Sequence, residues 1–178
     1  MFDKMSFQKL ANRNAGSVRE MEAMLQALDK SQAVIQFQPD GTIITANANF
    51  LNALGYTLPE IQGKHHSLFV EPDYKNSAEY KQFWAELARG KYQAAEYKRL
   101  AKGGREIWIQ ASYNPILDPN GKPFKVVKYA TDITRQVEAK REAERVGALV
   151  DQNLEKILTA IARANEQSRH DETNIQKP

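Results

Sequence analysis

The 178-residue chain has no cysteine and only three histidines. Without cysteine it cannot build a disulfide framework, a Cys-ligated zinc or iron–sulfur site, or a thiol nucleophile. No apolar run approaches the roughly 18 residues that a membrane-spanning helix needs. The first 17 residues also lack the apolar segment of a signal peptide. We therefore expect no membrane segment and a cytoplasmic location.

The chain also lacks a strong excess of positive or negative charge. The chain carries 25 basic and 22 acidic side chains, a net charge of +3, and no concentrated basic patch. This balance does not predict a nucleic-acid partner. No nucleophile–base–acid arrangement appears, and Lys102-Gly103-Gly104 is typical of a hairpin turn and not of a phosphate-binding loop. We expect no catalytic residues and no enzymatic activity.

The first 31 residues divide at Gly16. Residues 1–16 are polar and mixed, which predicts a flexible lead. Residues 17–31 predict an amphipathic helix, with Ser17 as N-cap. Its apolar positions, spaced 3, 4 and 3 apart, are Val18, Met21, Leu25 and Leu28. This stripe is too short to decide between pairing with another helix and packing on its own domain.

Residues 32–134 predict one α+β domain. A hairpin spans residues 33–45, and short helical segments follow up to a longer helix at 77–90. Three further strands are expected, at 92–100, 106–113 and 124–130. The pattern predicts a five-stranded antiparallel sheet with helices on one face.

A long helix is predicted for residues 135–166. Its apolar stripe comprises Val146, Val150, Leu154, Ile157 and Ile161, widened by Leu149 and Leu158. About 30 residues of helix are roughly 45 Å long, more than a small domain can cover. We therefore expect the stripe to pair with its copy in a second chain, giving a homodimer. Residues 167–178 are polar and predict a disordered tail.

The order of these elements and several short motifs resemble a PAS domain. The motifs are Pro39-Asp40-Gly41, residues 44–50, Leu54-Gly55-Tyr56, residues 60–64, residues 102–108 and the exit Asp132-Ile133-Thr134. Each motif is weak alone, but together and in order they are specific. The resemblance implies a PAS fold over residues 31–136, flanked by an N-terminal helix and a long C-terminal helix.

Three further segments narrow the resemblance: residues 65–69, residues 80–84 and residues 111–116. They are similar to PAS sensor domains of soluble bacterial chemoreceptors (methyl-accepting chemotaxis proteins), of the biofilm-dispersion type and the Aer redox type. The resemblance implies a signal-sensing module that acts on a downstream chemotaxis signalling domain or kinase complex. We expect the homodimer to be parallel, because both chains must pass their output in the same direction. The chain is then either a sensor fragment or a stand-alone PAS protein.

The resemblance also implies candidate cofactors. Haem b is one, with His65 or His66 as axial metal ligand through a neutral imidazole. FAD is second: Asn47 and Trp84 match the flavin-binding pattern, but Val70-Glu71 and Gln93 depart from it. An empty cavity or a small-molecule pocket stays open, with the two histidines merely capping a turn. The residues expected to line or flank the cavity are Phe50, Leu54, Phe69, Trp84 and Ile109.

The exit segment Asp132, Ile133 and Thr134 is the expected point of signal transmission. The Asp132 carboxylate suits the start of a helix, because it can accept backbone N–H bonds and its charge favours the positive end of the helix dipole. It can serve as a cap alone, or it can also set the angle between sheet and helix. The alternative to a sensor is a cofactor-free PAS domain that only dimerises.

Overall fold

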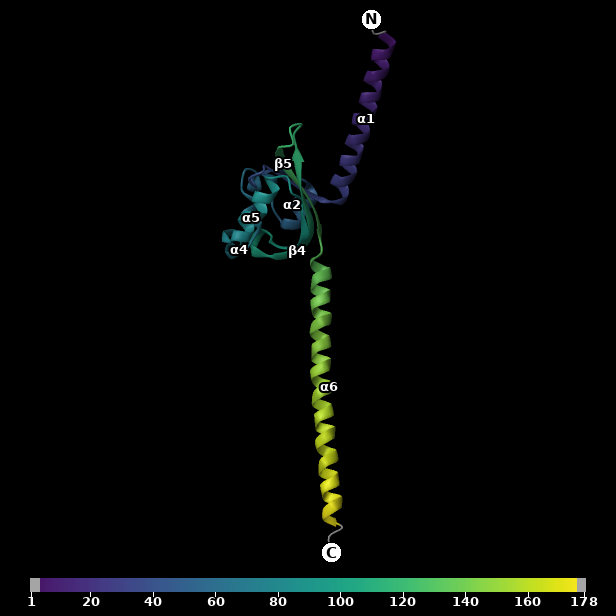
Figure 1. Ribbon diagram of the computed structural model, residues 1–178, viewed down its shortest axis with the longest axis vertical. Helices are drawn as coiled ribbons and strands as arrows, with labels where there is room; N and C mark the ends of the chain where they lie inside the picture. The colour runs from purple at the N-terminus through teal and green to yellow at the C-terminus, as the bar shows by residue number, and fades with distance from the viewer. Residues whose placement is uncertain (1–3, 176–178) are drawn as a thin grey trace. The chain divides into compact units, whose positions relative to one another are not determined.

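The computed structural model describes the backbone of residues 4–175 and the side chains of residues 15–167. The chain divides into two units after Thr134. The first holds helix α1 (Lys4–Ser31) and an α+β domain, and the second holds helix α6 (Thr134–Ile175) beyond its first residue (Figure 1).

The domain is built on a five-stranded antiparallel sheet with the strand order β2-β1-β5-β4-β3. The strands are β1 (Ala33–Phe37), β2 (Ile43–Ala46), β3 (Gln93–Leu100), β4 (Glu106–Leu117) and β5 (Pro123–Asp132). This confirms the predicted fold class. Strand β5 lies in the centre, bonded to β1 on one side and β4 on the other, and it leads into α6.

Short helices connect β2 to β3. They are α2 (Ala48–Leu54), α3 (Leu58–Ile61), the 3₁₀ turn η1 (His66–Phe69), α4 (Pro72–Asn76) and α5 (Ala78–Leu87); a second 3₁₀ turn, η2 (Lys102–Gly104), joins β3 to β4. Local sequence signals set these boundaries. Gly55 ends α2 with a φ of +74°, and Thr57 and Glu60 form a capping box at α3. Helix α5 is capped by Ser77, whose side chain accepts the backbone N–H of Tyr80.

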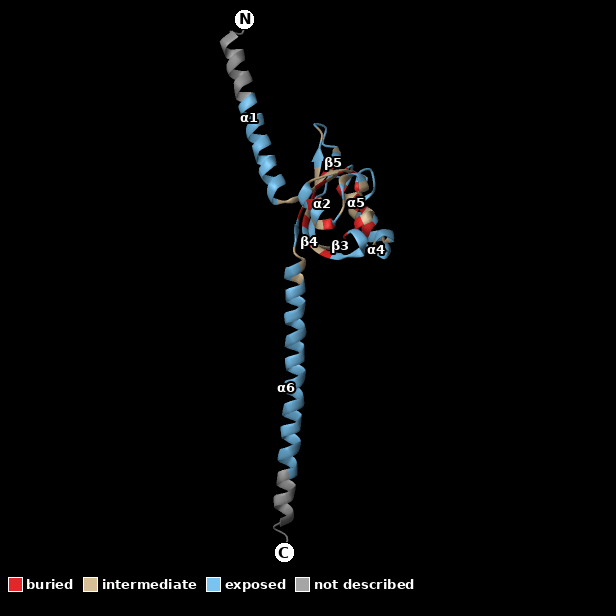
Figure 2. Cartoon of the chain, turned by 180° about the vertical axis from the view of Figure 1, so that it is seen from behind, coloured by how far each residue is buried: buried red, intermediate tan, exposed pale blue. Residues whose placement is uncertain are grey.

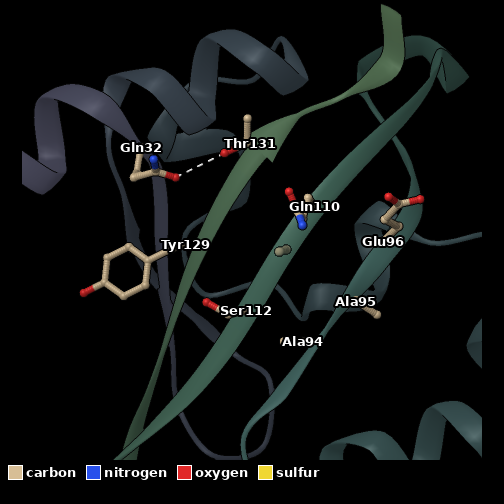
Figure 3. Close-up of a pocket in the computed structure, with 9 residues that line it drawn as sticks. Gln32, Ala94, Ala95, Glu96, Gln110, Ser112, Tyr129 and Thr131 are labelled. Carbon is tan, nitrogen blue, oxygen red and sulfur yellow. Dashed lines mark hydrogen bonds between the residues drawn. The ribbon is translucent and has the colours of Figure 1, made fainter. Parts of the chain in front are cut away.

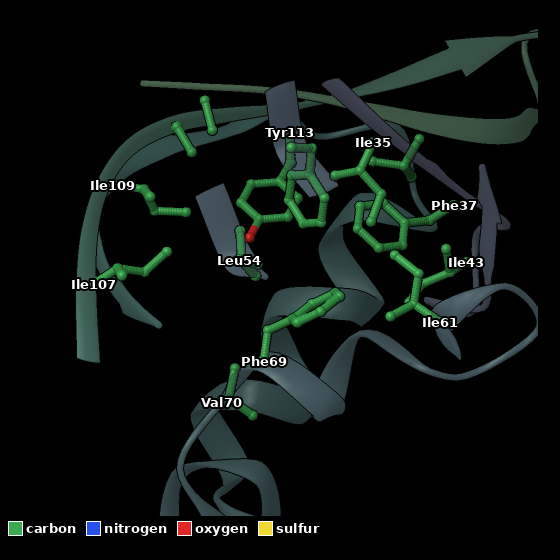
Figure 4. Close-up of a cluster of buried hydrophobic side chains, with 14 of the residues drawn as sticks. Ile35, Phe37, Ile43, Leu54, Ile61, Phe69, Val70, Ile107, Ile109 and Tyr113 are labelled. Carbon is green, nitrogen blue, oxygen red and sulfur yellow. The ribbon is translucent and has the colours of Figure 1, made fainter. Parts of the chain in front are cut away.

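One face of the sheet packs against these helices and forms the core. Along β4 the alternation places Ile107, Ile109 and Tyr113 on this inner face, as the sequence predicts. Figure 4 shows Phe69 from η1 and Phe37 from β1 pointing into the same interior as Tyr113. The core is rich in aromatic rings, which fill the space beneath the sheet.

The two terminal helices are longer than the sequence predicts. Helix α1 begins at Lys4 and not at Ser17, so most of the expected flexible lead is helical. Gly16 costs an internal helix position only about 1 kcal/mol and does not end it. Helix α6 continues to Ile175, through most of the expected disordered tail, because no proline interrupts it before Pro178.

The apolar stripes of both helices face solvent in the single chain. Figure 2 colours the described residues of α1 as exposed throughout and those of α6 as exposed from Glu138 onward. The large apolar residues of the two stripes are 42–61% exposed; they are Val18, Met21, Met24, Leu25, Leu28, Val146, Leu149, Val150, Leu154, Ile157, Leu158 and Ile161.

Candidate ligand site in the domain core

His65 fixes the start of turn η1. Its Nδ1 accepts the backbone N–H of Ser67 at 3.1 Å, and its Nε2–H donates to the carbonyl of Asp40 at 2.9 Å. Gly41 makes this position possible, because its φ is +91° and a Cβ there would lie 2.5 Å from the His65 Nε2. His65 therefore holds the turn against the β1–β2 hairpin.

His66 is fully buried and bonded at both ring nitrogens. Its Nδ1 shares a 2.8 Å hydrogen bond with the hydroxyl of Tyr80, and its Nε2 shares a 3.0 Å bond with the hydroxyl of Tyr113. Burial, and then the positive charges of Arg99 and Lys128, hold the pKa of His66 well below its usual value. His66 is therefore a neutral hydrogen-bonding group in the core.

The two histidines do not fit axial haem ligation. All four of their ring nitrogens already have protein partners, so iron would have to break one of these bonds. Rings from Phe37, Phe69 and Trp84 lie with their centroids 5.3–6.0 Å from that of His66, in edge-on contact.

The other predicted lining residues separate into two groups. Phe50, Leu54, Phe69, Trp84 and Ile109 are all buried and belong to one core cluster. Asn47 is not among them. Its Oδ1 accepts the N–H groups of Val34 and Phe50, and its Nδ2 donates to the carbonyls of Asp29 and Gln32.

Asn47 thus ties the end of α1 to the domain. Its contacts run to α1, β1 and α2, so it is a junction residue at the domain surface and not part of the cavity lining. The side-chain oxygen and nitrogen of Asn47 are thus both engaged in hydrogen bonds within the protein.

Two open hollows border the domain, one beside turn η1 and helix α5 and one over the sheet. One, of about 330 Å³, is lined by His65, Ser67, Lys75, Asn76, Tyr80, Lys81 and Trp84. The indole Nε1 of Trp84 is buried without a hydrogen-bond partner. The other, of about 470 Å³, lies over β3, β4 and β5 and is drawn in Figure 3 with Gln32 bonded to Thr131. Its residues Glu96, Gln110 and Ser112 alternate with the buried ones, so it lies on the outer face of the sheet.

The sequence analysis did not single out Arg99 and Lys128, two cations inside the core. Arg99 is 4% exposed and Lys128 is 1% exposed. The Arg99 Nη2 donates to the Tyr113 hydroxyl at 3.3 Å, and the Lys128 Nζ lies 4.8 Å from the centre of the Tyr113 ring. The strand pattern could have revealed Lys128, since it is in phase with the buried Val126 and Ala130 on β5.

Tyr113 is the centre of this polar cluster. Its hydroxyl contacts His66 and Arg99 directly. Burial alone would raise the pKa of Tyr113, but the neighbouring positive charges of Arg99 and Lys128 outweigh burial and lower it. Burial, reinforced by Arg99, in turn lowers the pKa of Lys128. The interior beneath the sheet is therefore electropositive.

The exit from the domain is tied directly to strand β4. Asp132 Oδ1 accepts from the backbone N–H of Thr134 at 2.9 Å and from its hydroxyl at 2.6 Å. The Ile133 N–H donates to the Trp108 carbonyl at 2.9 Å, and the Trp108 N–H donates to the Thr134 Oγ1 at 3.0 Å. The expected transmission residues thus lie together, with Asp132 bonded to the first residue of α6.

The family profile described as "PAS fold" matches residues 43–130, the segment that holds β2 to β5 and the polar core. The domain belongs to the PAS family. This PAS domain is 41% identical over 115 residues to the biofilm dispersion protein BdlA of Pseudomonas aeruginosa, covering 65% of the present chain and 28% of that protein.

One further relative and one solved structure are similar to the same domain. The aerotaxis receptor of Escherichia coli is 32% identical over 75 residues, covering 42% of this chain and 15% of the receptor. A solved light-oxygen-voltage domain, studied with a flavin analogue, has the same fold at a TM-score of 0.55 and 20% identity, covering 70% of this chain and 96% of that one. The chain spans less than a third of either curated relative, and its PAS domain is similar to those of chemotaxis sensors.

Within the described ranges, no helix combines the length and the apolar character needed to cross a bilayer.

Proposed function

We propose that the chain is a cytoplasmic, non-enzymatic sensor module that couples the state of its PAS core to the pairing of helix α6 in a parallel homodimer. The observation that carries the proposal is the bonding between Trp108 and Thr134. Strand β4 presents Ile109 and Tyr113 to the core, and its residue Trp108 is bonded to the first residue of α6. A shift of β4 therefore moves the start of the helix directly.

The dimeric output is supported by the exposed stripe of α6. Val150, Leu154 and Ile157 are 53–57% exposed, and they recur at coiled-coil spacing. A second α6 can cover this stripe along its whole length. The similarity to chemotaxis proteins supports a downstream chemotaxis signalling domain or kinase complex as the recipient of the signal.

The ligand state of the core is the input of this sensor. Flavin is supported by the similarity to the light-oxygen-voltage domain and the aerotaxis receptor. The core of this chain does not fit it, because closely packed rings occupy the interior: the centroids of Phe83 and Tyr113 lie 4.9 Å apart and those of Phe37 and Trp84 5.5 Å apart. We therefore propose a small ligand as input. An absorption spectrum of the purified chain tests this: a Soret band or flavin bands would contradict it.

The coupling can be tested without knowing the ligand. Because the chain has no cysteine, Val146→Cys introduces a single position for a spin label. Pulsed electron paramagnetic resonance measures the distance between the two labels of a dimer. It is applied to the chain with the native core and to the Tyr113→Phe variant, which lacks the central hydroxyl of the core. We expect Tyr113→Phe to shift the distance distribution, and Thr134→Val to suppress that shift.

The matched control for this experiment is Tyr92→Phe, since Tyr92 is 71% exposed and lies outside the core. It should leave the distances unchanged. If Tyr113→Phe also leaves them unchanged while the dimer persists, the coupling proposal fails and the alternative of a cofactor-free dimerisation domain is favoured.

A further inference from the structure

The PAS core buries two positive side chains and no negative one. Arg99 and Lys128 are at least 96% buried, while no Asp or Glu among the side chains at residues 15–167 is buried. A buried charge is strongly destabilising unless an opposite charge or a full set of hydrogen bonds compensates it. Among the described side chains, the two buried cations therefore have no buried carboxylate to compensate them.

The existing partners of the two cations are neutral. Arg99 donates to the carbonyl of Lys98 and to the hydroxyl of Tyr113, and its Nε is buried without a partner. The Lys128 ammonium lies over the rings of Tyr113 and Phe50, at 4.8 and 5.6 Å from their centres. These ring contacts are modest interactions compared with a charged hydrogen bond. The guanidinium retains a donor for an additional acceptor.

Arg99 also borders an open hollow, of about 430 Å³. Its other lining residues are Glu71, Tyr74, Glu79, Ala95, Glu96, Tyr97, Lys98 and Trp108. Three of these are aromatic, which suits an apolar ligand body. The carboxylates oppose a ligand with several negative charges, although Glu71 is itself paired with Lys98 at 2.7 Å.

We propose that this PAS core binds a monocarboxylate with an apolar or aromatic body, its carboxylate on the Arg99 guanidinium beside the Tyr113 hydroxyl, with the Lys128 charge across the Tyr113 ring adding to the attraction. The guanidinium fork suits the two oxygens of a carboxylate. The ligand reaches Arg99 through the hollow lined by Tyr74, Tyr97 and Trp108. This inference rests on the proposed function, since it names the ligand class of the same sensor core.

Calorimetric titration of the full chain with benzoate and with butyrate tests the proposal, with benzyl alcohol as the uncharged counterpart. We expect saturable binding of at least one carboxylate and none of the alcohol. Arg99→Gln and Lys128→Met should each weaken binding about tenfold or more. The matched controls are Arg89→Gln and Lys125→Met, which change an exposed arginine and a lysine on the outer face of β5. They should bind as the native chain does.

Three results would contradict the proposal. Absence of carboxylate binding by the folded native chain overturns it, as does full binding by both core variants that melt cooperatively. A tyrosinate absorption band present in the native chain at neutral pH and lost in Tyr113→Phe would also overturn it, because Tyr113 itself would then supply the negative charge.

These outcomes are independent of the coupling proposal. The spin-label shift caused by Tyr113→Phe requires no carboxylate. If that shift occurs and benzoate and butyrate do not bind, only the ligand class is wrong. If a carboxylate binds and the labels do not move, only the output is wrong.

Discussion

The backbone N–H of Trp108 donates to the hydroxyl of Thr134 at 3.0 Å, so an inner strand of the sheet is bonded to the first residue of the C-terminal helix. The same hydroxyl contacts Asp132 at 2.6 Å. This side chain therefore joins strand β4, the end of strand β5 and helix α6 at one point.

The first prediction concerns this junction. Asp132→Asn keeps a side-chain oxygen that can accept the Thr134 N–H, so we expect the free energy of unfolding to change by less than about 0.5 kcal/mol. Thr134→Val removes the hydroxyl from two partners and should cost about 1 kcal/mol or more. Urea denaturation measures both.

Distances between spin labels at position 146 then show whether Asp132 is only a helix cap or also transmits the signal. If Asp132→Asn leaves intact the shift that Tyr113→Phe causes, Asp132 is a cap and nothing more. A reduced shift in a stable Asp132→Asn variant supports its role in transmission.

The second prediction concerns the core hydrogen bonds. Tyr113→Phe leaves the His66 Nε2 and the Arg99 Nη2 without their shared partner in a buried place. We expect the free energy of unfolding to fall by about 1–3 kcal/mol. Tyr92→Phe, at an exposed position, should change it by no more than about 0.5 kcal/mol. Equal effects of the two substitutions in urea denaturation would contradict the buried network.

The third prediction rests on the lowered pKa of His66. The folded chain keeps this imidazole neutral, whereas the unfolded chain binds a proton below a pKa of about 6.5. Above that value neutral His66 therefore costs no stability. Below it, the free energy of unfolding falls as the pH decreases, by up to about 1.4 kcal/mol per pH unit from this group. His66→Gln cannot titrate, so its stability should depend less on pH.

The difference between the native chain and His66→Gln isolates this effect, since other acidic groups titrate equally in both. Urea midpoints at several values between about pH 8 and pH 5 provide the measurement. Parallel curves for the two chains would show that His66 is not buried in its neutral form.

The fourth prediction concerns Lys128. Lys128→Met keeps the length of the side chain and removes a buried charge that has no carboxylate partner. Without a bound anion, we expect the variant to be more stable than the native chain by about 1 kcal/mol or more. Lys125→Met on the outer face should have little effect. A native chain that melts above Lys128→Met without added ligand would contradict the expectation.

The fifth prediction concerns assembly. Leu154→Asp combined with Ile157→Asp places two charges in the apolar stripe of α6, and light scattering should show a loss of dimer. Gln152→Asp combined with Thr159→Asp adds the same charges elsewhere on this exposed helix and should leave the dimer intact. A native chain that is monomeric at tens of micromolar, roughly the concentration of such measurements, would contradict the assembly itself.

The sequence predicted the order of strands and helices because their signals are local. The turn at Pro39-Asp40-Gly41 and the capping box of Thr57 and Glu60 both depend on neighbouring residues alone. The role of Tyr113 depends on residues that the fold brings together from different strands. Arg99 and Lys128 are 29 positions apart in the sequence, and no local pattern indicates that they share one aromatic ring as a neighbour.

The histidine pair illustrates the same limit. Their position on a short turn is a local property, and the structure places them there, with His65 exposed at the N-cap of η1 and His66 buried. Whether a ring nitrogen is free for a metal depends on distant groups: the hydroxyls of Tyr80 and Tyr113 for His66, and the carbonyl of Asp40 for His65. These partners turn a candidate metal ligand into a structural side chain.

Ile133 is the single residue between the end of strand β5 and the start of helix α6. Such a short connector leaves no flexible segment that could absorb a change of length. Each residue added to a helix rotates the remainder of that helix by about 100° around its axis. Receptor chimaeras that join this domain to a foreign helix should therefore be sensitive to the phase of the junction: insertion of one residue should alter or invert the output, while insertion of seven should restore it.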